Sequence, residues 1–593
     1  MSKKYYWLGE GDPSDQDTFF IEALDDQLWS AGSGEQWDTC WYTGMPDSDV
    51  YKSLSPSQTI NHIPGNDALT IKSHLYNTLV NARNLLKETE AAKRYDFFPE
   101  TFSMPDEYFA YQQTAMDEPE AMWIQKPRNS SRGRGIAVVK EPGCVPVDDQ
   151  WIIQRYLDKP HLYEGHKYVL RCYVLITSVE PLRFYLYREG FCKLASERYS
   201  TTDLDNPYRH LTNPDINEEN TEAETLVTFF SFAHYREWLQ AQGADDAALF
   251  AQLKDLITLT VIAARETMRE QTNKLTEVAQ GCYELIGLDC TIDAALKPWI
   301  LECNLSPSLS TYASNDEGGD SEVTIKRQLV HDLVNILGLN HREGLGQLSA
   351  KARQEWELSH SGAFDCLFPA ASAGHYLHCF PIPRFHDLAT LPNGIDCQID
   401  LLPRRAVHEG ITFSDSLALI PGSGKHLLVP NELASWIWLH NAEGHSPEAI
   451  VQQLAETLPQ TPGLDREAFI KQLHRQVWDV LADWAQAGLF SAGSRQQKAT
   501  SLLSDEYQTR AFLWGEQRIQ VRSRCPIACH YLNPLCEDSS PADAADQVNQ
   551  TDDIYIDLEL VRADYGYLLL ENGELIYANC TLSRILVVIY EHY

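Results

Sequence analysis

The sequence predicts an α/β protein with several domains, part of it of the α+β type. The chain has 593 residues, which is too long for one hydrophobic core. Short segments that alternate apolar and polar residues recur in the first half and again within 500–593, as in half-buried strands. The stretch 223–280 instead carries apolar residues at the spacing of amphipathic helices. Apolar residues make up 44% of the chain and charged residues 22%, which is typical of a globular protein.

The stretch 284–307 predicts a β-hairpin, because polar and apolar residues alternate on both sides of a short turn. If Asp293 pairs with Pro298 across the turn, the register places Asp289 directly opposite Glu302. One face of the hairpin then carries three oxygen-bearing side chains: Asp289, Glu302 and Asn304. Hard oxygen ligands of this kind suit Mg²⁺ held jointly with nucleotide phosphates. An edge hairpin with a wet polar face is the alternative.

Several cations are expected to lie close together although the chain is acidic. Lys167 and Arg171 share one face of the strand 167–176, and the next hairpin adds Lys193. The loop 128–135 places glycines and arginines at the tip of another hairpin. Buried cations need an anion to offset them, and backbone N–H groups at a glycine-rich tip suit the same ligand. Salt bridges to neighbouring acids and an ordinary hairpin loop are the alternatives.

Charge and cysteine usage limit the partners and the compartment. The 48 basic and 84 acidic residues give a net charge of −36, which argues against general nucleic-acid or anionic-membrane binding. No apolar run approaches the length of a membrane-spanning helix, and the N-terminus lacks the core of a signal peptide. The 14 cysteines are scattered, several of them inside expected strands. We therefore expect reduced thiols and a cytoplasmic protein.

A series of short motifs follows one order between about residues 50 and 340. In sequence they are Asn61–Gly65, Leu69–Lys72, Tyr95–Phe102, Gln125–Pro127 with Arg132–Ile136, Gln154–Leu157 with His166–Arg171, Lys193–Glu197, His210–Asn213 and the hairpin. In this order they resemble the tubulin tyrosine ligase-like family, a branch of the ATP-grasp fold. The resemblance implies three ATP-grasp subdomains: an N-terminal one (1–115), a central lid (116–165) and a C-terminal one that carries the hairpin (166–340).

The resemblance implies a role for each matched residue. Contacts to ATP are implied for Lys72, Lys126, the closing loop Arg132, Gly133, Arg134 and Gly135, and the adenine hinge Gln154, Arg155, Tyr156 and Leu157. Catalytic contacts to the γ-phosphate and an acyl phosphate are implied for Lys167, Arg171 and Lys193. Binding of Mg²⁺ is implied for Asp289, Glu302 and Asn304.

The implied reaction is ATP-dependent amide formation. A carboxylate attacks the γ-phosphate, and an amine then attacks the resulting acyl phosphate while fixed cations and metal stabilise the transferred charge. The chain departs from the family pattern at two positions. Val169 stands where an acid is usual, and Lys193 stands where an arginine is usual, so the bidentate fork is lost. Both departures lie where the acceptor carboxylate or the amino acid is expected to bind.

The second half divides into three parts. Residues 341–400 are expected to be an irregular linker. Residues 401–492 resemble PqqD-like winged-helix domains, which bind leader peptides of ribosomal peptide precursors by strand addition; a generic winged helix is the alternative. Residues 500–593 are expected to form a small β-rich domain, faintly similar to the N-terminal part of HPr kinase-like proteins. Zinc binding is not favoured, because an unusual spacing separates Cys525, Cys529, His530 and Cys536.

These observations predict an ATP-dependent carboxylate–amine ligase that uses ATP and Mg²⁺. The expected substrates are an amino acid and a peptide or protein recruited by residues 401–492, with a ribosomal precursor peptide as the expected acceptor. An acidic tubulin-like tail is not favoured, because the negative field of the chain would repel it unless basic residues cluster locally. No nucleic-acid or membrane partner is expected. A small-molecule ligase and a catalytically silent ATP- and peptide-binding scaffold are the alternatives.

Overall fold

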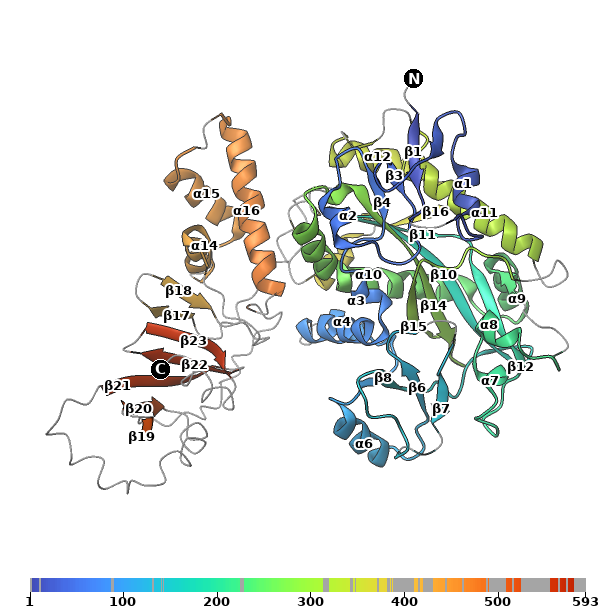
Figure 1. Ribbon diagram of the computed structural model, residues 1–593, viewed down its shortest axis with the longest axis horizontal. Helices are drawn as coiled ribbons and strands as arrows, with labels where there is room; N and C mark the ends of the chain where they lie inside the picture. Colours follow the sequence, from blue (N-terminus) through green and yellow to red (C-terminus); the bar gives the residue numbers. More distant parts are fainter. Residues whose placement is uncertain are drawn as a thin grey trace. The chain divides into compact units, whose positions relative to one another are not determined.

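The chain forms two compact units in the computed structural model (Figure 1). The N-terminal unit is Met1–Phe380 with His386–Cys397, and the C-terminal unit is Pro381–Phe385 with Gln398–Tyr593. The described residues are 3–9, 12–86, 90–130, 133–139, 141, 143–223, 229–312, 319–341, 345–346, 348–370, 373–380, 384, 387, 410–413, 416–419, 430–442, 445–460, 463–486, 489, 508–514, 517–523, 555–563, 566–571 and 574–580.

A 12-stranded mixed sheet organises the N-terminal unit. Its main path runs β13-β12-β10-β14-β4-β3-β1-β2, with β15 beside β14, β9 and β11 beside β10, and β16 beside β11. Pairing is parallel from β14 through β4, β3, β1 and β2, and antiparallel elsewhere. The strands are β1 (Lys4–Trp7), β2 (Trp29–Ala31), β3 (Thr39–Cys40), β4 (Thr59–Asn61), β9 (Leu162–Tyr163), β10 (His166–Val179), β11 (Leu182–Tyr187), β12 (Phe191–Arg198), β13 (Phe229–Ser231), β14 (Cys282–Ile292), β15 (Pro298–Leu305) and β16 (Phe364–Phe368).

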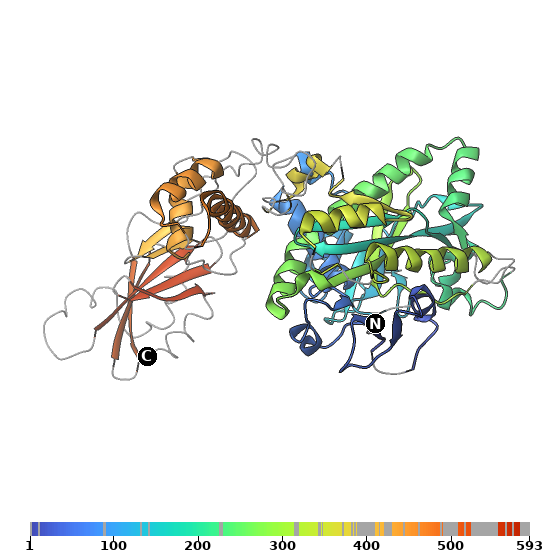
Figure 2. The same cartoon turned by 90° about the horizontal axis from the view of Figure 1, so that it is seen from above.

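Helices lie on both sides of this sheet, as the view from above shows (Figure 2). They are α1 (Thr18–Ala23), α2 (Ser48–Lys52), α3 (Asp67–Thr70), α4 (Lys72–Leu85), α5 (Glu90–Lys93), α7 (Pro207–His210), α8 (Pro214–Asn217), α9 (Phe232–Ala241), α10 (Asp246–Leu275), α11 (Gly319–Ile336) and α12 (Ala350–Ser359). Leu329 and Leu333 of α11 share a core cluster with Tyr173 and Leu175 of β10. The expected helical stretch 223–280 is helical from α9 onward, but β13 precedes α9 as an edge strand.

Helix α10 is long and apolar enough to cross a membrane by length and composition alone. However, 61% of its most apolar window is buried inside the protein. Its apolar residues, such as Leu256, Ile257 and Leu259, are almost fully buried. The helix is therefore best explained as a core helix of the N-terminal unit.

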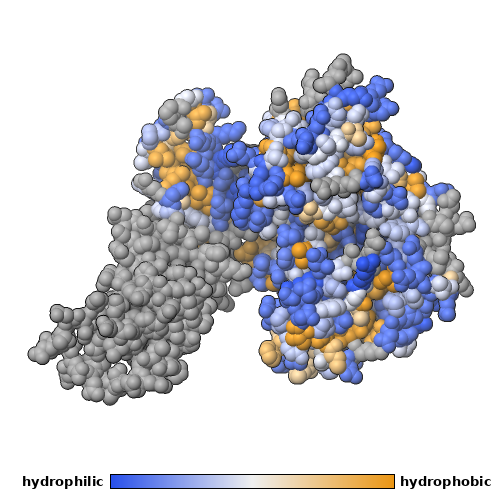
Figure 3. All heavy atoms as spheres, in the orientation of Figure 1, coloured by the Kyte–Doolittle hydropathy of each residue, from blue (hydrophilic) through white to orange (hydrophobic). Residues whose placement is uncertain are grey.

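A separate four-stranded antiparallel sheet with the order β5-β8-β6-β7 lies at the lower end of the N-terminal unit in Figure 1. It comprises β5 (Thr101–Ser103), β6 (Trp123–Pro127), β7 (Ala137–Val139) and β8 (Trp151–Arg155), with α6 (Tyr108–Asp117) packed on it. Hydrophobic residues gather at this lower edge in Figure 3. Phe109 and Met116 of α6 are 80% and 72% exposed. Together the two sheets give the mixed α/β fold that the sequence predicts.

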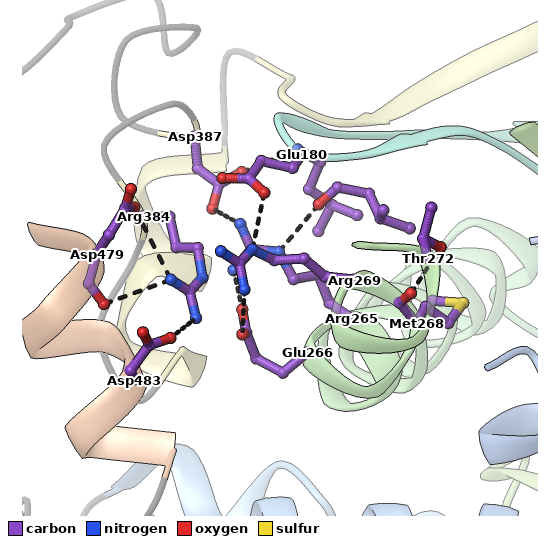
Figure 4. Close-up of polar contacts among 12 residues, drawn as sticks. Glu180, Arg265, Glu266, Met268, Arg269, Thr272, Arg384, Asp387, Asp479 and Asp483 are labelled. Atoms are coloured by element: carbon purple, nitrogen blue, oxygen red, sulfur yellow. Dashed lines mark hydrogen bonds and ion pairs between the residues drawn. The ribbon is translucent and has the colours of Figure 1, made fainter. Parts of the chain in front are cut away.

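The expectation of an irregular linker over 341–400 needs correction. Strand β16 extends the main sheet by pairing with β11, and α12 buries Glu357 beneath it. Glu357 accepts hydrogen bonds from Thr177, Arg183 and Tyr185, each at 2.9 Å. Asp387 pairs with the buried Arg265 of α10 (Figure 4). Buried carboxylates need such partners, so these residues complete the N-terminal unit.

In the described part of the C-terminal unit there are a β-hairpin, three helices and a five-stranded sheet. The hairpin is β17 (Gly410–Phe413) with β18 (Ser416–Leu419), followed by α14 (Glu432–Ala442), α15 (Pro447–Thr457) and α16 (Arg466–Gln486). Arg384 of this unit donates to Asp483 of α16 at 2.6 Å (Figure 4). The tail strands are β19 (Gln508–Trp514), β20 (Gln517–Ser523), β21 (Tyr555–Ala563), β22 (Gly566–Glu571) and β23 (Glu574–Cys580). The four residues considered for zinc lie outside the described residues.

Candidate functional site

A cleft of about 720 Å³ lies in the N-terminal unit between the small sheet and the main sheet. It is lined by Ile124, Lys126, Ile136, Gln154, Arg155, Tyr156, Leu157, Lys167, Val169, Lys193, His210, Leu211, Thr212, Asn213, Asp289, Thr291, Leu301 and Glu302. The structure thus brings together cations, two carboxylates and the expected hinge from six strands, β6, β8, β10, β12, β14 and β15, and from the segments that follow β8 and α7.

The hairpin of β14 and β15 places Asp289 directly opposite Glu302, as the sequence predicts. The register at the turn differs from the assumed one, because Ile292 rather than Asp293 pairs with Pro298. A bulge between Asp289 and Cys290 then shifts the register by one residue and restores the expected pair. The Asp293 carboxylate instead accepts hydrogen bonds inside the turn, from the backbone of residues 295 and 297.

Asp289 is a buried carboxylate held by cations. Arg171 donates to its two oxygens, from Nε at 2.6 Å and Nη2 at 2.9 Å, and Lys193 Nζ lies 3.6 Å away. Burial alone would raise the pKa of Asp289, but Arg171 and Lys193 outweigh burial and hold it below its ordinary value. Asp289 therefore stays ionised at neutral pH and offers oxygen ligands to the cleft.

Glu302 and Asn304 complete the oxygen-bearing face. Lys72, at the start of α4, lies 3.1 Å from the Glu302 carboxylate and donates to the carbonyl of Ser130 at 2.9 Å. Asn304 Nδ2 lies 3.4 Å from Asp289. Among the described residues, no group of three or more His, Cys, Asp or Glu is placed to hold a metal. Two carboxylates and an amide therefore fit a Mg²⁺ only if a ligand supplies further oxygens.

Three lysines face the cleft, of which Lys126 and Lys167 are buried, and all have lowered pKa values. Burial lowers the pKa of Lys167 to about 7, with a further contribution from Lys126. Burial lowers the pKa of Lys126 to about 8, partly offset by Glu302. Burial followed by the charge of Arg171 lowers the pKa of Lys193 to about 8. A group of desolvated ammonium ions marks a site for a polyanion, since an anion would restore their charged form.

The expected hinge lies along the wall of the cleft that β8 forms. Lys126 donates to Gln154 at 2.6 Å, and Lys167 donates to the Tyr156 hydroxyl at 3.1 Å. Tyr156 also bonds to His210 at 2.8 Å. Arg155 differs from its neighbours, since its guanidinium pairs outside the cleft with Glu100 at 2.8 Å and Glu118 at 2.9 Å. Any contribution of Arg155 to ligand binding would therefore come from its backbone.

Residues 210–213 line the cleft, although no role in the site was predicted for them. The motif His210–Asn213 is one of those that carry the family resemblance, but its residue types do not indicate a particular chemical role. In the structure it follows α7 and reaches the cleft because His210 is anchored between Tyr156 and the carbonyl of Asp203, at 2.8 and 2.9 Å. Tertiary contacts therefore determine the position of this segment, and the local sequence could not predict it.

The described residues 133–135 of the glycine-rich loop are not among those that line the cleft. Gly133 has φ +71° and packs against α8, where an added Cβ would lie 2.3 Å from Ile216. Gly135 has φ +75°, so both positions favour glycine. Arg134 is exposed, and Arg132 lies outside the described residues. The predicted closure of this loop over a triphosphate stays a prediction.

Comparisons with known proteins agree with the order of the motifs. Residues 51–343 match the model of the tubulin-tyrosine ligase family. A Homo sapiens protein named probable tubulin polyglutamylase is 33% identical over 338 residues, covering 54% of this chain and 53% of that protein. A Homo sapiens tubulin polyglutamylase is 31% identical over 316 residues, covering 52% of this chain and 24% of the relative. A Mus musculus tubulin monoglutamylase is 33% identical over 313 residues, covering 51% and 25%.

The chain spans about half of the first of these relatives and about a quarter of the other two. They support the expected ATP-dependent, amide-forming ligase, but they correct the expected substrate. A ribosomal precursor peptide was the wrong expectation, because the relatives are named for the glutamylation of tubulin. That expectation relied on the resemblance of residues 401–492 to PqqD-like domains, and a resemblance at the level of the fold does not identify what a surface binds.

The matched region contains every residue that lines the cleft, from Ile124 to Glu302. It also contains the complete series of motifs from Asn61 to the hairpin. Residues 51–343 are therefore the part of the chain that is similar to the tubulin-tyrosine ligase family.

Proposed function

We propose that the protein is an ATP-dependent ligase that joins glutamate, through an amide bond, to a side-chain carboxylate of a protein substrate. One observation carries the proposal: three lysines with lowered pKa values face a pair of carboxylates in a single cleft. The similarity of residues 51–343 to the tubulin-tyrosine ligase family supports the use of ATP, and the names of the relatives support glutamate and tubulin as the first substrates to test.

In the proposed complex the adenine lies along β8 and the phosphates lie among the lysines. Lys126 and Lys167 neutralise phosphate oxygens, which restores their own charged form. Asp289, Glu302 and Asn304 would hold Mg²⁺ together with phosphate oxygens. The metal, when bound, would withdraw charge from the transferred phosphoryl group.

The substrate carboxylate attacks the γ-phosphorus, ADP leaves, and an acyl phosphate forms. The glutamate amine then attacks the acyl carbon, phosphate leaves, and the amine proton is released. Arg171 is rigidly held by Asp289, so its charge needs no reorganisation as negative charge develops beside it. Lys193 lies 3.6 Å from the same carboxylate and extends the cationic wall.

The net charge of −36 opposes binding of an acidic protein tail only if the charge is treated as uniform over the surface. The cleft concentrates Lys126, Lys167 and Lys193, and low-dielectric walls focus the field of such a group. Local cations therefore support the binding of an acidic acceptor at the cleft. We expect this binding to weaken steeply with added salt.

The test combines two measurements on the full-length protein with ATP, Mg²⁺, glutamate and tubulin. Phosphate release should depend on both glutamate and acceptor, and intact-mass analysis should show acceptor that has gained glutamyl residues. Glu302→Gln should lose both signals. Phosphate release that does not depend on glutamate would exclude the ligase. Incorporation into a glutamate-rich peptide but not into tubulin would keep the ligase and exclude tubulin as the acceptor.

Two further proposals concern the rest of the chain. Residues 401–492 are proposed to be a PqqD-like winged helix, supported by the order β17, β18, α14, α15 and α16. Limited proteolysis should release this segment as a folded fragment if the proposal is correct. A cytoplasmic location is also proposed, supported by free thiols at nine of the described cysteines. Fractionation of expressing cells would test the location.

A further inference from the structure

Lys167 is a buried cation of the cleft without a carboxylate partner. It is 7% exposed, and among the described residues no Asp or Glu forms an ion pair with its ammonium group. Its Nζ lies instead 3.1 Å from the hydroxyl oxygen of Tyr156 and 4.4 Å from the centre of the same ring. An ammonium group can only donate, so the hydroxyl must offer it a lone pair. The direction of the Tyr156 O–H bond therefore decides whether this contact stabilises the cation.

His210 determines that direction. Its Nε2 lies 2.9 Å from the backbone carbonyl of Asp203, and because a carbonyl oxygen can only accept, Nε2 carries the hydrogen. The other nitrogen of the neutral ring, Nδ1, is then an acceptor without a hydrogen. It lies 2.8 Å from the hydroxyl of Tyr156, which donates to it. Three hydrogen bonds thus run in one direction, from the ammonium group through the hydroxyl and the imidazole to the carbonyl.

Tyr199 is the alternative acceptor for the hydroxyl of Tyr156. The hydroxyl of Tyr199 donates to the carbonyl of Asp158 at 2.8 Å, so only its lone pairs remain for Tyr156. If Tyr156 donated to Tyr199, Nδ1 of the 3% exposed His210 would be buried without a donor, which costs free energy. The hydrogen bond to His210 avoids this cost.

The surroundings of His210 favour its neutral form. Burial is the largest cause that lowers the pKa of His210, and the positive charges of Lys167 and Arg209 act in the same direction. The carbonyl and the carboxylate of Asp203 act in the opposite direction without outweighing burial. Two tyrosine rings, whose centroids lie 5.8 and 5.7 Å from that of the imidazole, add no charge at neutral pH. The neutral ring is the form in which the three hydrogen bonds keep their direction.

We propose that His210 is a positioning residue for Lys167, and that it acts by orienting the hydroxyl of Tyr156 as a hydrogen-bond acceptor. Lys167 then keeps two N–H donors for an anion in the cleft. An acceptor bonded to an ammonium group also favours its charged form. The inference rests on the proposed function, in which the anion is the triphosphate, and it adds a residue that acts through two others.

The test measures, by calorimetry from about pH 6 to about pH 9, the affinity of the full-length protein for a non-hydrolysable ATP analogue with Mg²⁺. His210→Leu removes the acceptor, and affinity at neutral pH should fall about three- to tenfold, as for one lost hydrogen bond. The pH above which affinity weakens should fall by about half a unit, because Lys167 loses its proton more easily. Tyr156→Phe keeps the ring, removes the hydroxyl and should give the same two changes.

Two further variants separate hydrogen bonding from shape. His210→Asn offers a side-chain oxygen close to the position of Nδ1, so it should recover most of the affinity that His210→Leu loses. Tyr199→Phe is the matched control, because it keeps the ring beside His210 and removes only the alternative acceptor. It should change affinity by less than about twofold.

Lys167→Met is the background that shows whether His210 acts through the lysine. In a protein that already carries Lys167→Met, adding His210→Leu should lower affinity by less than about twofold, and the pH dependence should not shift further. Tyr156→Phe in the same background gives the same comparison if His210→Leu does not fold.

Four outcomes overturn the inference and leave the proposed function standing. Additive losses in the Lys167→Met background would mean that His210 acts on the nucleotide or on the fold directly. Equal losses in His210→Asn and His210→Leu would assign the effect to shape. A loss in Tyr199→Phe as large as in Tyr156→Phe would make Tyr199 the acceptor. Unchanged affinity in both His210→Leu and Tyr156→Phe would remove the role altogether.

A different result separates the inference from the proposed function. If the ATP analogue does not bind the wild-type protein at any pH tested, the proposed function is wrong and the inference falls with it.

Discussion

The two faces of the central sheet around β10 and β14 carry different chemistry. Residues at alternate positions point to opposite faces. One face bears Arg171 opposite Asp289, with Glu302 beside them. The other bears four buried cysteines in neighbouring positions on four strands: Cys172, Cys192, Cys290 and Cys303. On each of these strands, two consecutive residues thus face different environments. One faces the charged cleft, and the other is buried in a core without water.

Burial acts in opposite ways on the two faces. It raises the pKa of Cys172 to about 12 and the pKa of Cys290 well above its ordinary range, so the thiols are neutral packing groups. On the charged face the same burial is opposed by fixed partners, and Asp289 remains ionised. Burial alone therefore does not produce a reactive site. The charge state of a buried group depends on its partners on the neighbouring strands.

The largest effect is expected from Arg171→Met, which removes both hydrogen bonds to the buried Asp289. Breaking a buried ion pair from one side costs about 3–5 kcal/mol, so urea denaturation should show a clear loss of stability in addition to loss of turnover. Arg188→Met is the control, because Arg188 is 58% exposed and pairs with Asp365 at the surface. It should cost less than about 1 kcal/mol. Equal costs would mean that burial does not distinguish the two pairs.

Glu302→Gln should lower turnover about a hundredfold while changing stability by less than about 1 kcal/mol. The amide keeps the shape of the side chain and a hydrogen bond to Lys72 but removes the charge that would hold a metal. Asp96→Asn is the control, since Asp96 pairs with Lys297 at the surface and should leave turnover unchanged. Rates of phosphate release under identical conditions make the comparison. Wild-type rates in Glu302→Gln would remove Glu302 from the metal site.

Nucleotide binding should take up protons at slightly alkaline pH. The pKa values of Lys126 and Lys167, about 8 and about 7, leave these groups partly neutral, and a bound triphosphate favours their charged forms. Affinity should therefore weaken as pH rises from about 7 to about 9. Calorimetry in two buffers of different ionisation enthalpy measures the uptake. Lys167→Met should reduce it, and proton release in the wild type would contradict the assignment.

The smallest effect is expected on the cysteine face. Cys290→Ala removes a sulfur that no proposed step uses, so turnover should stay within about twofold while stability falls by about 1 kcal/mol. The same result is expected for Cys303→Ala. Turnover and denaturation measured side by side would check it. A large loss of turnover with stability retained would show that the two faces are not chemically separate.

Much of the charged face could be predicted because strand periodicity is local. Alternation assigned Lys167, Arg171 and Asp289 to their faces, and the series of motifs supplied the partners. The pairing of Asp289 with Glu302 was correct although the assumed turn was not. An offset at Pro298 and a bulge near Cys290 cancel each other. The alternation of apolar and polar residues cannot reveal such a bulge, because one extra residue changes the pairing of the two strands without changing the types of residue in them.

Other features were out of reach because they depend on distant segments. The motif residue His62 received no role from sequence, and the structure pairs it with Glu284, 2.8 Å away and more than two hundred positions later in the chain. Lys326 carries no local signal, since a lysine on an amphipathic helix is usually solvated. Its burial follows from the packing of α11 against the sheet, which is a property of the whole unit.

The ion pairs of Arg183 and Arg265 limit how far the chain can be shortened from its C-terminal side. The family region ends at residue 343, yet Arg183 pairs with Glu357 and Arg265 with Asp387. A protein cut at residue 343 would keep all the residues that line the cleft but would strip these buried guanidinium groups of those carboxylates. The smallest autonomous folding unit is therefore longer than the region that homology marks, and truncation at its edge should yield an insoluble product rather than a minimal enzyme.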